Sequence, residues 1–230
     1  MNGKKTKVMT VNVQRPANIK VGEEPIELVK TFTYLGSVMT EEGGTEEDIK
    51  SRLGKARGVF AQLNPVWRSS QFRVDSKLKI YQSCVVSVLL YGSECWRMTQ
   101  QDSAALSVFQ TSCLRKICRI FWPDTISNRD LLKKTKKEDI LTTIRRRRWR
   151  WVSHTLRREK DNIARTALTW TPEGRRRRGR PKITWRRTIE AEAGTMNRSW
   201  RELETLAQDR HEWGNLVGAL CASSRRKEPE

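Results

Sequence analysis

The sequence predicts a mainly α-helical protein with a small N-terminal β-hairpin or meander, a helical bundle and a basic helical C-terminal domain. Apolar residues recur at three- and four-residue spacing through most of the chain after residue 45, which predicts amphipathic helices. Alternating β-branched residues are confined to residues 4–38. Residues 141–187 carry 17 Lys or Arg against three acids, a net +14 of the chain's +20, and such a stretch is typical of proteins that bind nucleic acid.

The N-terminal segment has the pattern of short strands joined by turns. Val and Ile alternate with polar residues in KVMTVNV and NIKV, the turn signal GEEP follows at 22–25, and PIELVKTFTYLGSV resumes with β-branched and aromatic residues. Residues 40–46 form a short polar segment that contains two glycines. They separate the strands from a helical remainder.

Three helices with short links are expected to form the bundle. The first runs over about 45–63, with Thr45 and Asp48 as a capping box, and the second over about 75–96. The third starts at Thr99, with Asp102 three residues later, and ends before Pro123. The residues expected inward are Ile49, Leu53, Ala56, Phe60, Leu63, Leu78, Tyr81, Val85, Val88, Cys95, Leu106, Phe109, Cys113, Ile117 and Ile120.

Further helices are expected after Pro123. They are a short helix opened by the cap Ser127 to Asp130, a basic helix over about 138–159, a short helix over 162–170, a helix from about Thr184, and a last helix that begins at Ser199 with Glu202 as its capping partner. The last helix is expected to turn Trp200, Leu203, Leu206, Trp213, Val217 and Leu220 inward.

The basic helix is amphipathic. Its apolar half holds Trp149 and Trp151 with several aliphatic residues, so these rings are expected in the core rather than against bases. The opposite stripe is polar, and the arginine-rich segment RRRRGRPK at 175–182 is expected to be an exposed loop. The candidate nucleic-acid-binding residues are Arg146, Arg147, Arg150, His154, Arg157, Arg175, Arg176, Arg177, Arg178, Arg180 and Lys182; Ser153 lies in the same stripe.

The composition indicates an intracellular protein, nuclear or cytoplasmic, with no membrane partner. The longest apolar run, residues 84–91, is far shorter than the roughly 20 residues that span a bilayer. The cysteines are odd in number and fall mostly in apolar helical stretches, so we expect reduced cysteines in the core. They are Cys84, Cys95, Cys113, Cys118 and Cys221.

We find no catalytic constellation in the sequence and expect no catalytic residue, metal ligand or cofactor in this chain. A polymerase needs paired aspartates to hold two Mg²⁺, and no Asp-Asp pair occurs. Pro123-Asp124 lacks the later acid-x-Lys of restriction-type nucleases, and Cys113 and Cys118 lack two further zinc ligands at close spacing. His154 is open to two interpretations, a general base or a surface hydrogen-bonding residue.

Four strings together resemble a known family. They are NGKKTKVM at 2–9, FTYLGS at 32–37, LLYGSECW at 89–96, and the pair WVSHTLRRE and RRRRGRPKITW. Their order and spacing resemble the C-terminal third of the endonuclease-reverse transcriptase of LINE-type non-LTR retrotransposons. The chain differs where it has Ser153 in place of a glycine and Gly214 after Trp213.

The resemblance implies a place for each segment in that polymerase. The chain would begin just after the catalytic aspartates of the palm, with Met1 as an internal methionine, and Lys5 would lie near the phosphates of the nucleotide. The primer grip would consist of Phe32, Tyr34, Leu35 and Gly36. The expected domains are the end of the palm with the primer grip (1–40), a thumb-like bundle (41–123), a basic C-terminal domain (124–222, with the arginine-rich loop at 171–183) and a tail (223–230).

Our leading interpretation is a truncated reverse transcriptase that binds template-primer or element RNA or DNA through the phosphate backbone but lacks the catalytic aspartates. Its partners would be nucleic acid and the rest of the parent polyprotein, and the parent would need Mg²⁺. An alternative is a stand-alone, non-catalytic nucleic-acid-binding protein derived from such an element. A third is a fragment without activity, whose arginine runs act as a nuclear-import signal.

Overall fold

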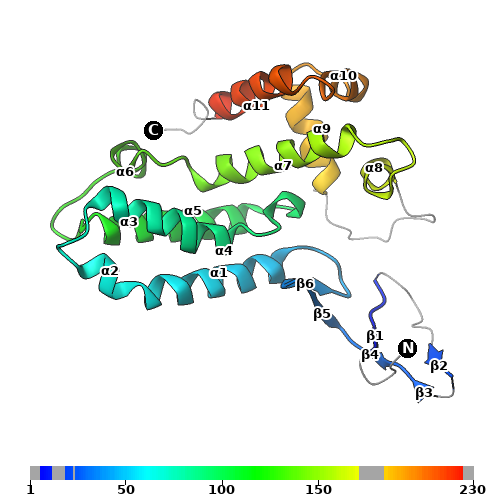
Figure 1. Cartoon of the computed structure of the whole chain (residues 1–230), viewed down its shortest axis with the longest axis horizontal. Coiled ribbons are helices and arrows are strands. Elements are labelled where there is room, and N and C mark those ends of the chain that lie inside the picture. Colours follow the sequence, from blue (N-terminus) through cyan, green and yellow to red (C-terminus); the bar gives the residue numbers. More distant parts are fainter. Residues whose placement is uncertain (1–5, 12–18, 23, 171–183, 225–230) are drawn as a thin grey trace. The chain divides into compact units, whose positions relative to one another are not determined.

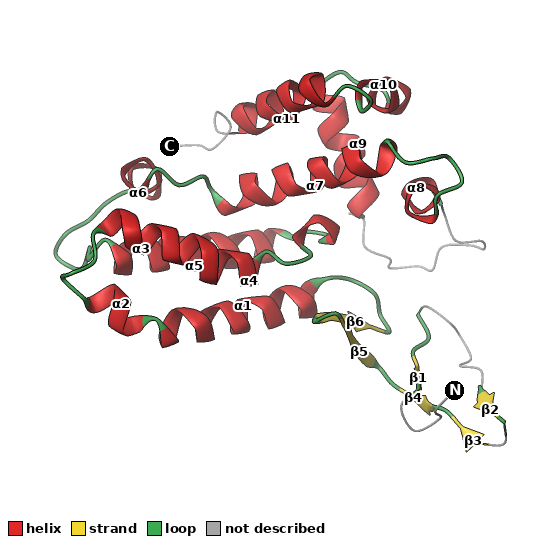
Figure 2. Cartoon of the chain, in the orientation of Figure 1, coloured by secondary structure: helices red, strands yellow, loops and turns green. Residues whose placement is uncertain are grey.

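The computed structural model describes residues 6–11, 19–22, 24–170 and 184–224. The described residues are mainly helical, with short strands confined to the N-terminal end (Figures 1 and 2). This confirms the predicted fold class. None of the helices in the described ranges is both long enough and apolar enough to cross a bilayer.

The strands pair two by two. The first pair is parallel, β1 with β4, and the other two are antiparallel, β2 with β3 and β5 with β6. The predicted hairpin is therefore present at β5 and β6. The strands are β1 Lys7–Val8, β2 Lys20–Val21, β3 Glu24–Pro25, β4 Glu27–Leu28, β5 Thr31–Tyr34 and β6 Ser37–Thr40.

The chain divides into two compact units, residues 1–92 and 93–230. The four expected domains stay a prediction. The first unit contains the strands with α1 Glu46–Gln62, α2 Asn64–Arg68, α3 Val74–Ile80 and α4 Ser87–Leu89. The second contains α5 Gln100–Ile117, α6 Asn128–Thr135, α7 Ile140–Leu156, α8 Ile163–Thr169, α9 Trp185–Thr195, α10 Trp200–Leu206 and α11 Arg210–Ser224.

Aromatic side chains organise the core of the first unit. The rings of Phe60 and Trp67 stack with centroids 5.1 Å apart, and the Tyr81 ring meets Phe60 edge-on at 6.3 Å. The indole of Trp67 donates to the Phe60 carbonyl at 2.8 Å. Lys77 is buried, and its ammonium donates to the carbonyls of Trp67 and Ser69. The buried side-chain nitrogens of Trp67 and Lys77 are thus hydrogen-bonded, as burial requires.

The second predicted helix ends earlier than expected. In place of one helix over 75–96, α3 continues into a π-helical segment, Tyr81–Val86, and then into α4. Gly92 follows with a φ of 75°, in the left-handed region that favours glycine. The chain therefore turns there, and the segment after it forms only a 3-10 turn, Ser93–Cys95.

The core of the second unit forms around Trp149. Its side chain is fully buried, and its ring centroid lies 5.7 Å from that of Trp213. The Trp213 indole donates to the Trp149 carbonyl at 3.1 Å. Apolar side chains from α7, α8, α9, α10 and α11 complete the cluster. The expectation of a core role is confirmed for Trp149, whereas Trp151 is half-buried.

The last predicted helix is two helices. The Ser199 and Glu202 capping box is formed as expected and lowers the pKa of Glu202 through the hydrogen bonds from Ser199. The helix that it opens, α10, ends at Leu206, and Asp209 starts α11 by accepting from two backbone N–H groups. The second start was missed, because Leu206 and Trp213 are seven residues apart, so the apolar spacing continues across 207–209.

The cysteines are free, but not all lie in the core. Cys113 and Cys221 are buried, Cys118 is half-buried, and Cys84 and Cys95 are exposed. Cys84 lies within the π-helical segment Tyr81–Val86. There the turns are wider than those of the α-helix on which the prediction was based. The expectation of core cysteines is therefore wrong for Cys84 and Cys95.

Candidate nucleic-acid interface

The hairpin of β5 and β6 ends in a two-residue turn. Tyr34 pairs with Ser37, so Leu35 and Gly36 alone form the connection. Both have positive φ, 48° and 78°, as a type I′ turn requires. A leucine rarely adopts this conformation, and it is 71% exposed here. The turn therefore presents an apolar side chain to solvent at the cost of local backbone strain.

Helix α1 holds the hairpin through two side chains. The Asp48 carboxylate accepts from the Val38 N–H at 3.0 Å, and the Lys55 ammonium donates to the Gly36 carbonyl at 3.2 Å. Asp48 was expected to cap α1 with Thr45, but the Thr45 side chain makes no capping hydrogen bond. The capping prediction is wrong because the hairpin recruits this carboxylate instead.

Arg52 lies beneath the turn and is 6% exposed. Its guanidinium lies 4.6 Å from the centroid of the Tyr91 ring, and its Nε is 3.9 Å from the Asp48 carboxylate. A Cβ added to Gly36 would lie 3.3 Å from Arg52 Nη2. The guanidinium is thus enclosed between the turn and an aromatic ring, and Nε and Nη2 find no hydrogen-bond acceptor in the described residues.

Three donors from α7 share the carboxylate of Glu192 on α9. Arg145 Nε lies 3.0 Å from it, Arg148 Nη1 3.4 Å, and the Trp149 indole nitrogen 2.6 Å. Burial lowers the pKa of Arg148, and the nearby Glu192 carboxylate raises it. These two arginines therefore stabilise the packing of α7 and leave little charge for a ligand.

Part of the predicted arginine stripe of α7 also binds protein atoms. Arg146 donates to the Glu138 carboxylate at 2.6 Å, and this bond raises the pKa of Arg146. Arg157 donates to the Ser153 hydroxyl and to the Ala207 carbonyl. Ser153, placed in the stripe by the sequence, is buried. The stripe is therefore interrupted by contacts that hold α7 in its unit.

The remaining positions of the stripe face outward. Arg150 and His154 are exposed, and Arg147 is half-buried. Arg150 has no acidic partner in the part of the chain that the structure describes, and His154 Nε2 lies 3.1 Å from an Arg158 guanidinium nitrogen. Other expected site residues lie outside the described residues, namely Lys5, Arg175, Arg176, Arg177, Arg178, Arg180 and Lys182.

Comparison with known proteins gives two similarities. The family model "Domain of unknown function (DUF6451)" matches residues 59–91, from the end of α1 to the turn after α4. An uncharacterized transposon-derived protein of Caenorhabditis elegans is 25% identical over 228 residues, which cover 93% of this chain and 80% of that protein. No solved structure matches. The expected likeness to transposon sequences is confirmed at this level, over most of the chain.

Two buried arginines were missed, although the sequence holds a signal for both. Arg52 is three residues after Ile49, and Arg148 is four residues after Ile144 and four before Val152. This spacing puts each on the apolar face of its helix. Neither arginine was expected in the core, because long cationic side chains are rarely buried without a partner.

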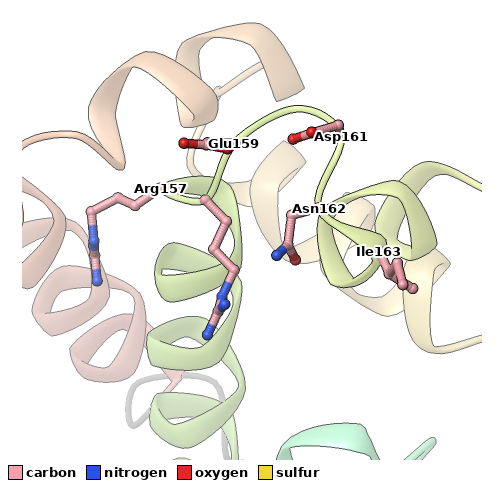
Figure 3. A pocket seen from close by; sticks show the side chains of 6 residues that line it. Arg157, Glu159, Asp161, Asn162 and Ile163 are labelled. Carbon is pink, nitrogen blue, oxygen red and sulfur yellow. The ribbon is translucent and has the colours of Figure 1, made fainter.

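A depression of about 520 Å³ lies where α7 ends and α8 begins (Figure 3). Its lining combines Arg157 and Arg158 with the acids Glu159 and Asp161. Charges of both signs line it, so it offers no uniform field to a polyanion. Nor do the described residues bring three or more His, Cys, Asp or Glu together as a metal site would require.

Proposed function

We propose that the chain is the C-terminal part of a reverse transcriptase of a non-LTR retrotransposon, and that it binds template-primer or element RNA or DNA without catalysing polymerisation. The turn between β5 and β6 carries the proposal. It projects Tyr34, 59% exposed, and Leu35 from a hairpin that α1 fastens through Asp48 and Lys55. A fixed projection of this kind suits the gripping of a primer strand. The transposon-derived relative supports a transposable-element origin.

The chemistry at the turn fits a sugar-phosphate backbone. Gly36 has no side chain, and the place that a Cβ would take lies against the Arg52 guanidinium, so a buried cation lies beneath the turn. Lys55 adds a cation next to it, and the exposed Tyr34 ring can cover a sugar or base. On α7, Arg150 and His154 are outward polar groups that can contact further phosphates or sugars.

A charge reversal at the hairpin tests the proposal. Lys55→Glu should weaken binding of a labelled RNA–DNA template-primer by about tenfold, the scale of one hydrogen bond to a charged group, ~1.5 kcal/mol. The measurement is fluorescence anisotropy at fixed salt. Lys50→Glu is the matched control, since Lys50 is also exposed on α1 but pairs with Glu47 at 2.7 Å. Equal losses of affinity for the two variants would mean that only net charge matters, and would contradict the proposal that the hairpin grips the primer.

A stand-alone nucleic-acid-binding protein is the second candidate, favoured by the missing Asp-Asp pair. In the leading proposal, the aspartates that hold Mg²⁺ belong to the rest of the parent polyprotein, which would be a partner of this chain in the nucleus or cytoplasm. The genomic sequence upstream of Met1 separates the two. An open frame that encodes paired aspartates supports the parent enzyme, whereas a promoter followed by an intact start supports the stand-alone protein.

A further inference from the structure

The loop between α5 and α6 carries the most exposed large apolar side chain in the described residues. Trp122 is 90% exposed and its neighbour Phe121 59%. By contrast, Trp67, Trp96 and Trp149 are at most 1% exposed. An indole in water forgoes the large gain that burial gives an aromatic ring. This ring is therefore a candidate for contact with something outside the chain.

The loop leaves α5 in a fixed conformation. Arg119 has a φ of 55°, its N–H donates to the Lys116 carbonyl, and the Ile120 N–H donates to the Arg115 carbonyl at 3.0 Å. This pair of bonds is a Schellman motif, which closes the end of a helix. The Asp124 N–H then donates to the Phe121 carbonyl at 2.8 Å, so Trp122 sits at the corner of a turn.

The far end of the loop is anchored as well. The Arg115 guanidinium donates to the Ile126 carbonyl at 3.1 Å and to the Asn128 side chain at 2.7 Å. Ser127 caps α6 by accepting from the Asp130 N–H. Both ends of the loop are thus tied to helices, so the backbone that carries the ring loses little conformational freedom when a ligand binds.

The segment that carries the ring has a net positive charge. Residues 115–137 contain eight Lys or Arg and two Asp, a net charge of +6. The Lys134 ammonium is near enough to Cys118 to lower its pKa against the larger, opposite effect of burial, so α6 brings charge toward the start of the loop. Arg129 is exposed just beyond its end. An aromatic platform among cations matches bases joined by phosphates.

We propose that Trp122 is a stacking platform for an unpaired base of single-stranded nucleic acid. This rests on the proposed function, since it adds a single-strand contact to a protein that binds template-primer. In a duplex both faces of a base are already stacked on other bases, so the Trp122 ring should bind unpaired bases in preference to paired ones. The cations around the loop hold the phosphates on either side of the stacked base.

Replacement of the ring tests the platform. Trp122→Ala should weaken binding of labelled oligothymidylate about 5- to 150-fold, the range for one base–aromatic stack, while binding of a blunt duplex of the same length stays within about twofold. Trp122→Phe keeps a stacking face and should retain most of the affinity. Phe72→Ala removes a 46% exposed ring from the first unit and should leave single-strand affinity unchanged.

The other outcomes each overturn the platform. Equal losses for single strand and duplex would indicate a general effect on folding, which thermal unfolding checks. An unchanged single-strand affinity, with duplex binding intact, refutes the platform and leaves the proposed function standing. A change of sedimentation coefficient without a change of affinity would make Trp122 a protein contact. If the unsubstituted chain bound no nucleic acid at all, both this proposal and the proposed function would be wrong.

Discussion

Glu192 shows how one side chain can determine the use of several arginines. It accepts hydrogen bonds from Arg145, Arg148 and Trp149, all on one face of α7. Arg148 is 3% exposed, so this carboxylate is the main compensation for its buried charge. A buried cation left without its partner is strongly destabilising. Glu192 is therefore a structural residue in a protein whose basic surface suggests only binding.

Glu192→Gln should lower the free energy of unfolding by about 3 kcal/mol, the scale for breaking a buried ion pair. The amide keeps the size of the side chain but removes the charge that Arg148 faces. Urea denaturation followed by circular dichroism measures the loss. Glu190→Gln is the control on the same helix, because Glu190 pairs with Arg186 at 2.8 Å in solvent and should cost less than about 1 kcal/mol. Similar losses for both variants would contradict the special role of Glu192.

Individual residues could be predicted from the sequence where helical periodicity alone decides their environment. Trp149 and Leu203 are buried as their spacing predicts. The predictions for Asp48 and Ser153 were wrong. Asp48 accepts a hydrogen bond from the Val38 N–H, ten residues away in sequence, and Ser153 accepts one from Arg157 on the next helical turn. A periodic pattern reports which side of a helix is apolar, but it contains no information about which tertiary donor reaches a polar side chain.

Three helices end with a residue other than glycine in the left-handed conformation. Arg119 follows α5, Lys136 follows α6 and Asn197 follows α9, with φ of 55°, 51° and 51°. At each, the next N–H reaches back five residues to a helix carbonyl, which completes the Schellman motif. Glycine adopts this backbone without the steric cost of a Cβ. The ends of these helices therefore carry removable strain.

Lys136→Gly should raise the free energy of unfolding by up to about 1 kcal/mol. The left-handed conformation costs a side-chain-bearing residue roughly 1–2 kcal/mol, and the greater freedom of glycine in the unfolded chain offsets part of the gain. Thermal unfolding measures the change. Asn197→Gly should gain less, since asparagine tolerates this region. A loss of stability for Lys136→Gly would mean that its side chain makes a stabilising contact that outweighs the strain.

Helix starts were more predictable than helix ends. Thr99, Ser127, Asn162, Thr184 and Ser199 all cap their helices with the side chain, because a cap is a local contact between residues two or three apart. Asp209 followed by Glu212 carries the same signal and was overlooked. The π-helical turn before α4 has no comparable local signature, whereas Gly92, shortly after the end of α4, is a local signal for the turn there.

At the scale of the whole chain, net charge overstates what a polyanion can contact. Of the α7 arginines, Arg145 and Arg148 face Glu192, and Arg146 faces Glu138. Glu138 and Glu192 thus neutralise part of the charge of α7. Arg150 remains outward on the described surface. The sequence predicted the sign and the position of the basic stretch, but the division into structural and available charges required the pairing in the folded protein.

Salt dependence measures the number of available charges directly. If six to ten phosphates are contacted, the logarithm of the binding constant for duplex should fall against the logarithm of salt concentration with a slope of roughly −5 to −9, about −0.9 per contact.

Arg150→Ala should reduce the slope by about one unit, because this side chain has no internal partner among the described residues. Arg148→Ala should unfold the protein more easily and leave the slope of the folded fraction unchanged, since its charge is buried. Anisotropy titrations over a range of salt concentrations give all three slopes. Binding that is equally tight at low and high salt would contradict phosphate recognition, and with it the assignment of this basic surface to nucleic acid.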